Sequence, residues 1–403
     1  MFVAMPFRSL AALLSSSLVL FGVLALVSPA PAQPLSLADA DLILMGAHAG
    51  ESSGHWIATA GDVNGDGFAD LLVGANRAPN LNDKDTGRVS LIYGGPSLPP
   101  VIDLANPLPG SVVQILGTAT GDKLGVSVTD LGDFNGDGFD DFALGARGAS
   151  FLGRSDAGVV YLIFGGASLP PVIDTSSLGA SGIVIGGAEA RDELGRAVSG
   201  AGDFNNDGHP DLLMGAWKAD AMGLSNAGRA FILFGGPGLP GVIDLAGAGA
   251  AGVVFEGARA GDSAGYAVAD LGDFNGDGID DVVITAEHAD PNGSKSGEAY
   301  VVLGQANPPA VVSLKDPIAS GISATILHGA LPGDNLGHAC AGAGDFDGDG
   351  LDDLVISSED ADRNGLHEVG EVYLIFGSAA PPRDHRGRRP RRPRGDLPRD
   401  RRG

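Results

Sequence analysis

Short apolar runs separated by polar, glycine-rich segments recur along the chain from about residue 40 onward. One representative stretch contains VVQILG (112–117), GVSVTDLG (125–132), DFALGA (141–146) and GVVYLIFGG (158–166). Each run is rich in β-branched or aromatic residues and is bounded by Gly, Asp or Asn, which is typical of strands rather than helices. The pattern therefore predicts an all-β protein.

The polar segment between the second and third runs occurs five times: GDVNGDGFADLLVGA at 61, GDFNGDGFDDFALGA at 132, GDFNNDGHPDLLMGA at 202, GDFNGDGIDDVVITA at 272 and GDFDGDGLDDLVISS at 344. The copies are 71, 70, 70 and 72 residues apart. Four strands per unit make one propeller blade, and blades must stack because one blade cannot bury both faces. We predict a propeller of five four-stranded blades at about 40–105, 106–175, 176–245, 246–315 and 316–377.

The fourth run of three units is followed by GGPSLPPVIDL (94–104), GGASLPPVIDT (165–175) or GGPGLPGVIDL (235–245). Proline cannot donate to a β-ladder, so these stretches read as extended linkers to the next blade. A peptide-binding polyproline motif is the alternative, but the repeated spacing favours the structural role.

Each acidic loop carries oxygen-bearing side chains at positions 1, 3, 5 and 9, counted from its first Asp. These side chains are Asp62, Asn64, Asp66, Asp70; Asp133, Asn135, Asp137, Asp141; Asp203, Asn205, Asp207, Asp211; Asp273, Asn275, Asp277, Asp281; and Asp345, Asp347, Asp349, Asp353. Alternate placement in a curled loop aims positions 1, 3 and 5 at one centre, and Gly at position 6 permits the sharp turn. Hard oxygen ligands without His or Cys select Ca²⁺, so the loops predict up to five calcium ions.

Two other interpretations of the loops were weighed. The EF-hand requires a bidentate Glu at position 12, where this chain has Val73, Leu144, Met214, Ile284 and Ile356, so that motif is excluded. A plain Asx turn is the bland alternative, but a turn needs one Asx side chain rather than three carboxylates repeated five times.

The N-terminus reads as an export signal over residues 1–32. Arg8 precedes a largely apolar run over 10–27, and residues 30–32 form an A-x-A cleavage site. An uncleaved membrane anchor is the alternative; after cleavage no membrane span is expected. Cys340 is the single cysteine, so no internal disulfide can form. We expect a secreted, periplasmic or cell-surface protein.

The net charge of −25 excludes binding to nucleic acid and favours cations as partners. Residues 378–403 differ, because the chain becomes rich in Arg and Pro from Arg383 onward and is predicted to be disordered. This tail is interpreted as shifted-frame readthrough, with a basic arm for anionic polymers as the alternative.

No catalytic constellation is evident. The eight histidines form no H-E-x-x-H motif, and no G-x-S-x-G elbow is present. His55 and His338 lie in the strand before their calcium loops, where packing or surface roles are the default. Trp56, Trp217 and Lys218 lie near blade ends, where they can contribute to a ligand surface or to the core.

Each unit resembles the FG-GAP repeat through its G-D-x-N-G-D-G-x-x-D-L-x-x-G-A and G-x-V-Y-x-x-F-G segments, over about residues 40–377. The Gly-Ala pair survives at 74–75, 145–146 and 215–216 and is lost in the last two copies. The family occurs in the propeller of integrin α subunits and in exported bacterial proteins. The resemblance implies a calcium-stabilised propeller, usually of seven blades, so this chain is either a five-bladed ring or a truncated propeller.

The sequence thus predicts a non-enzymatic adhesion or recognition module for a protein or glycan at the cell surface. The alternatives are a propeller that accompanies a secreted hydrolase, as in the phospholipase D specific for GPI anchors, and a purely structural envelope protein. Because repeats occupy residues 40–377, we expect no catalytic domain within that region.

Overall fold

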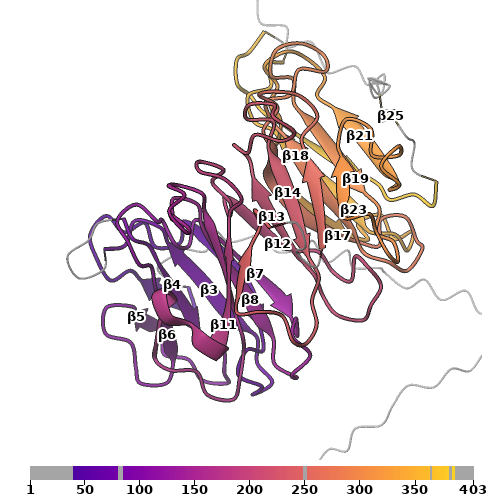
Figure 1. Cartoon of the computed structure of the whole chain (residues 1–403). Helices are drawn as coiled ribbons and strands as arrows, with labels where there is room; N and C mark the ends of the chain where they lie inside the picture. The colour runs from indigo at the N-terminus through magenta and orange to yellow at the C-terminus, as the bar shows by residue number, and fades with distance from the viewer. Residues whose placement is uncertain (1–39, 80–84, 248–251, 364, 381–383, 386–403) are drawn as a thin grey trace, which may run out of the picture. The chain divides into compact units, whose positions relative to one another are not determined.

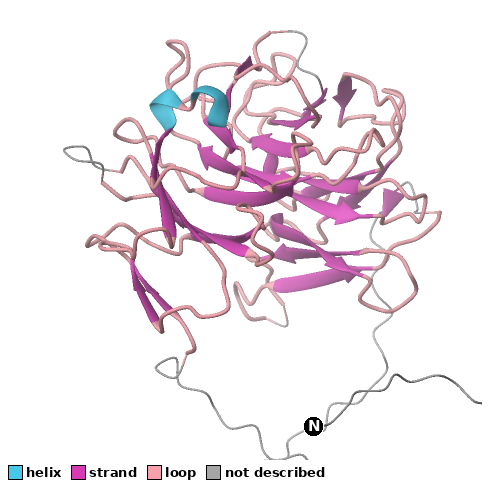
Figure 2. Cartoon of the chain, turned by 90° about the horizontal axis from the view of Figure 1, so that it is seen from below, coloured by secondary structure: helices cyan, strands magenta, loops and turns pink. Residues whose placement is uncertain are grey.

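The computed structural model describes residues 40–79, 85–247, 252–363, 365–380 and 384–385. Strands are the main regular secondary structure of these residues, and the described helices are two short 3-10 turns, η2 (Thr175–Ser177) and η3 (Gly179–Ser181) (Figures 1 and 2). The predicted export signal and most of the Arg/Pro tail lie outside the described residues. Within the described part, no helix has both the length and the apolar character needed to cross a membrane.

Five successive sheets contain most of the strands, as the sequence predicts. Four sheets have five strands each: β2 (Trp56–Gly61), β3 (Asp70–Ala75), β4 (Arg88–Ile92), β6 (Val112–Leu116), β10 (Val172–Asp174); β7 (Ser127–Gly132), β8 (Asp141–Ala146), β9 (Val159–Ile163), β11 (Gly182–Gly186), β15 (Val242–Asp244); β12 (Ala197–Gly200), β13 (Leu212–Ala216), β14 (Arg229–Leu233), β16 (Gly252–Glu256), β20 (Val311–Ser313); and β17 (Ala264–Gly272), β18 (Asp281–Ala286), β19 (Glu298–Val302), β21 (Ala324–His328), β25 (Asp384–His385). The fifth sheet has three described strands, β22 (Leu336–Gly344), β23 (Asp353–Ser358) and β24 (Glu371–Ile375). We number these sheets as blades 1 to 5.

The sequence unit and the blade are offset by one strand. We expected VVQILG to open the same blade as GVSVTDLG, but β6 pairs antiparallel with β4, so it is the fourth strand of the preceding blade. The same pairing joins β11 to β9, β16 to β14 and β21 to β19. Each unit therefore closes the blade before it, which ties consecutive units together through main-chain hydrogen bonds.

The proline-rich linkers also take part in the sheets. Their apolar VID or VVS segments form β10, β15 and β20, each parallel to the fourth strand of an earlier blade. At the N-terminal side, β5 (Val101–Asp103) pairs in the same way with β1 (Ile43–Met45), but this pair is a separate two-stranded sheet. In blade 4, β25 occupies the corresponding place beside β21, so part of the predicted disordered tail is a short strand.

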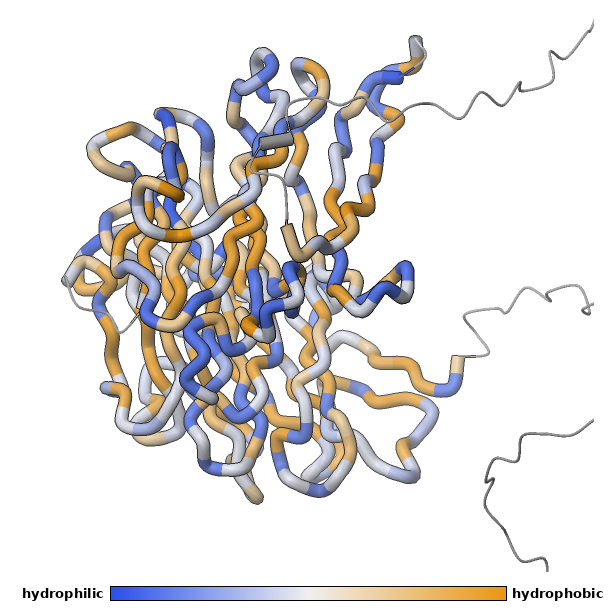
Figure 3. Tube along the Cα trace, turned by 90° about the vertical axis from the view of Figure 1, so that its right-hand side faces the viewer, coloured by the Kyte–Doolittle hydropathy of each residue, from blue (hydrophilic) through white to orange (hydrophobic). Residues whose placement is uncertain are grey.

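The core lies between neighbouring blades. Along β8, Phe142 and Leu144 pack with blade 1, whereas Ala143 between them packs with blade 3. This alternation of side chains buries both faces of each interior blade. Apolar residues follow the strands and polar residues gather in the loops at their ends (Figure 3). The first strands of consecutive blades, from β2 through β7, β12 and β17 to β22, contact one another.

The surviving Gly-Ala pairs are explained by close packing between blades. A Cβ on Gly215 would lie 2.1 Å from the carbonyl oxygen of Gly265 in the next blade. Gly265 itself has φ +80°, which disfavours other residues. In blade 4 Thr285 replaces the first of these glycines, and its hydroxyl donates to the carbonyl of Gly337 at 2.8 Å. The lost motif has thus been replaced by a hydrogen bond at the same contact.

Candidate metal sites

The five predicted acidic loops all lie at the same kind of position, between the first and second strands of a blade. In each loop the carboxylate at position 1 organises the turn. In the second loop, Asp133 accepts from the backbone N–H of Asp137 at 2.8 Å and of Gly138 at 2.9 Å. The equivalent pair of bonds occurs in the other four loops.

The glycine at position 6 has the conformation that the sequence predicts. The residues are Gly67, Gly138, Gly208, Gly278 and Gly350, with φ between +85° and +94°. Because a side chain rarely adopts this left-handed region, the tight curl depends on glycine here. In the first four loops the curl places the side chains at positions 3 and 5 within hydrogen-bonding distance of each other.

The carboxylate at position 9 is buried beneath the loop. Asp70 is 2% exposed, and Asp141, Asp211, Asp281 and Asp353 are fully buried. One oxygen of each accepts from a backbone N–H of the glycine that follows the third strand, at 2.8–2.9 Å. Position 9 therefore anchors the loop to the end of the third strand.

Two of these buried carboxylates have an oxygen without a partner. The Oδ2 atoms of Asp211 and Asp281 have no hydrogen bond of ordinary geometry with any described residue, although the backbone N–H group of the Asn at position 3 of each loop lies close enough to lower the pKa of each carboxyl slightly. Burial, and then the negative charges at positions 5 and 1, raise the pKa of Asp211 and of Asp281 to about 8. The same causes raise the pKa of Asp141 to about 7 and that of Asp70 to about 6. A cation in the loop would supply the missing partner and offset this repulsion.

The donor set fits calcium. Each loop offers carboxylate oxygens from three or four Asp and, in the first four loops, an Asn amide oxygen. In those loops the Asn amide also donates to the position-5 carboxylate, as Asn135 does to Asp137 at 3.0 Å. The fifth loop has Asp347 at position 3, and ligand oxygens of Asp345, Asp347 and Asp353 lie within 4.8 Å of one another. All-oxygen sets of this kind are those that Ca²⁺ prefers.

Neighbouring loops are also joined to one another, which the sequence reasoning missed. At position 8, Asp140 accepts from the N–H of Asp62 in the preceding loop at 2.6 Å. Asp280 and Asp352 make the equivalent bonds to the loops of blades 3 and 4. The recurrence of Asp at position 8 in three of the five loops was the available signal.

The opposite ends of the blades carry a second group of polar and aromatic side chains. Trp217, left open between surface and core, is half-buried, and its indole N–H donates to Glu193 at 3.1 Å. Lys218 pairs with the same carboxylate at 2.6 Å. The Arg196 guanidinium lies 3.4 Å from the centre of the Tyr266 ring. Trp56, in contrast, is 44% exposed at the edge of blade 1.

Comparison with known proteins agrees with this architecture. The FG-GAP repeat model matches five segments, residues 53–92, 126–163, 194–233, 264–302 and 341–375. Each of the first four segments contains the first three strands of one blade, and the fifth begins within β22 and contains β23 and β24. The chain belongs to the FG-GAP repeat family. The resemblance noted in the sequence is therefore confirmed, and the matches cover all five blades.

The chain is similar to curated relatives of two kinds. Integrin alpha-PS2 of Drosophila melanogaster is 36% identical over 185 residues, which is 44% of this chain and 12% of the fly protein. Integrin alpha-5 of Xenopus laevis is 30% identical over 178 residues, 43% of this chain and 15% of the relative. Phosphatidylinositol-glycan-specific phospholipase D of Homo sapiens is 33% identical over 189 residues, 46% of this chain and 21% of the enzyme. The similarity thus spans a minor part of each relative.

Proposed function

We propose that this FG-GAP protein is an exported, calcium-stabilised propeller that recognises a protein or glycan at a cell surface and does not itself catalyse a reaction. The acidic loops carry the metal part of the proposal. Fully buried Asp211 and Asp281 each present an unpaired oxygen beneath a ring of further carboxylates, an arrangement that a hard dication stabilises. The 20 side chains at positions 1, 3, 5 and 9 are the proposed ligands.

Calcium would take the place of disulfides in this chain, which has one cysteine. Extracellular calcium modules bind at roughly 10⁻⁴ to 10⁻³ M. At free calcium about ten times the dissociation constant, each independent site stabilises the fold by about 1.4 kcal/mol. Five sites together would contribute about 7 kcal/mol, which is comparable to the stability of an ordinary domain.

The recognition part rests on the similarity to integrin α chains and on the free blade ends opposite the loops. Those ends combine aromatic, basic and acidic groups, including Arg196, Trp217 and Tyr266. Aromatic and Arg side chains are enriched where proteins bind one another. The predicted export signal at residues 1–32 supports the export part of the proposal.

The test immobilises the purified chain and measures retention of extracellular-matrix proteins and surface polysaccharides in calcium and in EDTA. Retention that requires calcium supports the recognition module. A folded, calcium-loaded chain that retains nothing would indicate a structural envelope protein instead. Melting curves recorded on the same samples separate a failure of metal binding from a failure of ligand binding.

A hydrolase-associated propeller is the second candidate, because the chain is similar to phosphatidylinositol-glycan-specific phospholipase D. That similarity covers 18% of the Bos taurus enzyme and 21% of the Homo sapiens enzyme. Release of a phosphatidylinositol-glycan-anchored reporter from vesicles by this chain alone would favour the enzyme, whereas anchoring that persists would favour recognition.

A further inference from the structure

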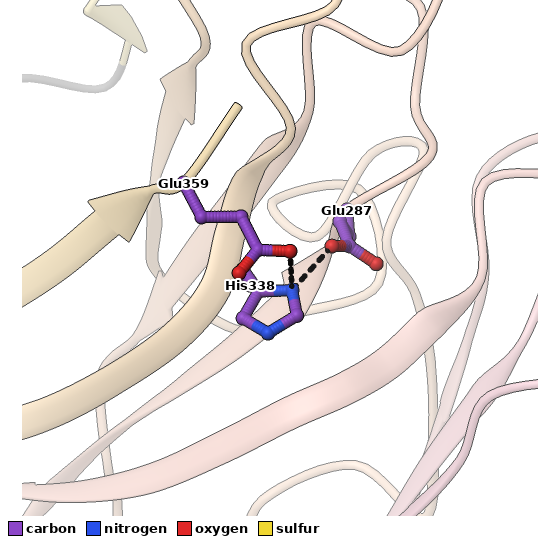
Figure 4. A group of neighbouring side chains, drawn as sticks. All are labelled: Glu287, His338 and Glu359. Atoms are coloured by element: carbon purple, nitrogen blue, oxygen red, sulfur yellow. Dashed lines mark hydrogen bonds and ion pairs between the residues drawn. The ribbon is translucent and has the colours of Figure 1, made fainter. Parts of the chain in front are cut away.

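Three side chains converge at the blade ends opposite the acidic loops (Figure 4). Glu287 follows β18, His338 lies in β22 and Glu359 follows β23, so they come from blades 4 and 5. The Nδ1 atom of His338 is 2.7 Å from Oε1 of Glu287 and 2.9 Å from Oε1 of Glu359. A single imidazole nitrogen therefore faces two carboxylates, one from each blade.

One proton on Nδ1 cannot serve both carboxylates of this trio. The Glu287 side chain is 4% exposed, and its ion-pair partners among the described residues are His338 and, at 3.5 Å, His288. A Nδ1 atom holds one proton at most, so it can donate fully to only one of the two carboxylates. The Arg196 charge and the Tyr266 hydroxyl also interact with Glu287. Two carboxylates that face one nitrogen still repel each other, whereas a divalent ion at the same point would bind both carboxylates and the nitrogen lone pair.

The donor set distinguishes this point from the acidic loops. Imidazole nitrogen combined with carboxylate oxygen suits Zn²⁺ and related first-row divalent ions, whereas calcium prefers oxygen ligands alone. Zinc bonds of about 2.0–2.2 Å place two ligands of a tetrahedral site roughly 3.3 Å apart. To reach that spacing, the two distances from Nδ1 would lengthen by roughly 0.4–0.6 Å.

The trio is accessible to solvent, and neighbouring side chains orient its members. His338 is 34% exposed and Glu359 is 49% exposed, which leaves an entry path and room for a water ligand. The Tyr266 ring lies 5.7 Å from the rings of both His288 and His338, and its hydroxyl hydrogen-bonds Glu287. Ser263 lies within hydrogen-bonding distance of Nδ1 of His288, at 3.0 Å, so the other ring nitrogen is left toward Glu287. Outer contacts of this kind hold metal ligands in place.

We propose that Glu287, His338 and Glu359 form a zinc site that joins blades 4 and 5. Zinc coordinates the Nδ1 lone pair, and any proton on that atom is released to solvent. The site is separate from the calcium loops, because β22 and β23 run from this end of blade 5 to the acidic loop at the other end.

The test is isothermal titration of zinc chloride into the purified chain in excess calcium, so that the acidic loops are already occupied. We expect one tight site in the wild type. His338→Gln and Glu287→Gln should weaken it by more than the roughly 10- to 100-fold that loss of an outer contact costs. His55→Gln is the matched control, since His55 holds the same repeat position in blade 1 and is exposed, and it should bind as the wild type does.

Melting curves in calcium without zinc establish that each variant is folded. If His338→Gln does not fold, Glu359→Gln carries the test, because this half-exposed side chain tolerates substitution and its loss should still weaken binding at least about tenfold. The proposal is overturned if the wild type takes up no zinc in excess calcium. It is equally overturned if the Glu287 and His338 variants bind zinc like the wild type, which would place the ion elsewhere.

Discussion

At the residue scale, the buried Asp at position 9 has two roles. One oxygen accepts a backbone hydrogen bond, and the other is available to the proposed cation. One oxygen of Asp211 accepts from Gly235 at 2.9 Å, while the other lies unpaired near the charges of Asp203 and Asp207. This side chain is therefore expected to stabilise the fold when a cation is bound and to destabilise it when the loop is empty. A substitution that keeps its shape and removes its charge separates these two effects.

We expect the effect of Asp211→Asn on the melting temperature to be opposite in the absence and in the presence of calcium. In EDTA the variant should melt higher than the wild type, because a buried, repelled carboxylate is gone while an acceptor for Gly235 remains. In excess calcium it should melt lower, by the loss of about 1.4 kcal/mol of binding free energy at roughly ten times the dissociation constant. Calorimetric melting of both proteins with and without EDTA measures this, and higher stability in both conditions would refute metal binding by this loop.

Asp192 is expected to make stability depend on pH, apart from the metal loops. It is 2% exposed and accepts from the N–H of Glu189 at 3.0 Å. Burial raises its pKa to about 6, from about 3.9 in the unfolded chain. Folding therefore favours the protonated form, and this contribution is complete below about pH 4 and is lost as the pH rises through about 6.

The Asn side chain in Asp192→Asn cannot ionise, so this variant should not lose stability as the pH rises through about 6. Compared with the wild type, it should be more stable at neutral pH, by on the order of 1–3 kcal/mol, and similar near pH 4. Urea unfolding in excess calcium at several pH values measures the difference. Asp41→Asn, at an exposed position, is the control and should follow the wild-type curve. A parallel curve for Asp192→Asn would contradict the assignment.

At the element scale, three pairs of neighbouring blades meet at a glycine contact, where the second strand of one blade approaches the first strand of the next with no side chain between them. The contact between Gly215 and Gly265 is the clearest case, because only backbone atoms surround the site of a Cβ. The sequence shows the Gly-Ala motif but does not show which residue it contacts. That partner lies 50 residues later, in the next repeat.

We expect Gly215→Ala to destabilise the protein by roughly 1–3 kcal/mol, the usual cost of forcing an extra methyl group into a packed interior. The added Cβ would meet the carbonyl of Gly265 at 2.1 Å, so the blades must separate. Gly95→Ala is the matched control, because its Cβ would meet no atom within 4 Å. Chemical denaturation in calcium compares the two, and equal stabilities would rule out the close contact.

At the scale of the whole molecule, blades 5 and 1 lack contacts that the other blades share. The residue at position 2 of the loop is at most 2% exposed in the first four blades, at Val63, Phe134, Phe204 and Phe274, but Phe346 of blade 5 is 68% exposed. In the first four blades this residue's carbonyl also accepts from the segment after the third strand of the following blade. Ile57, on β2 of blade 1, is 63% exposed. Blade 1 and blade 5 therefore each have one face that is partly exposed.

Among the described residues blade 5 has no fourth strand of its own, but β1 at the N-terminal side resembles one. β1 pairs with β5 as β6, β11 and β16 pair with their linker strands, yet β1 belongs to no blade. Its Leu44 already packs on blade 1 with Val73 and Val112. β1 therefore has the contacts of a fourth strand whose first three strands are β22, β23 and β24.

We expect β24 to pair with β1 and close a five-bladed ring, with Tyr373 opposite Ile43 by analogy with the β19–β21 register. Ile43→Cys with Tyr373→Cys, in a Cys340→Ser background, should form a disulfide within one chain under mild oxidation. Leu42→Cys with Tyr373→Cys is the mismatched control, because adjacent residues of a strand face opposite sides. Non-reducing electrophoresis distinguishes the outcomes: crosslinked dimers would instead show that the exposed blades pair between chains.

The sequence by itself determined the strand character, the number of repeats, the place of each acidic loop and the glycine at its sixth position. These features depend on local spacing and backbone conformation, and the same local pattern recurs in all five repeats. Only the tertiary structure decided that each unit donates its first strand to the preceding blade, because pairing joins segments far apart in the chain. It alone placed Glu287, His338 and Glu359 together, since side chains from different blades meet only when the blades stack.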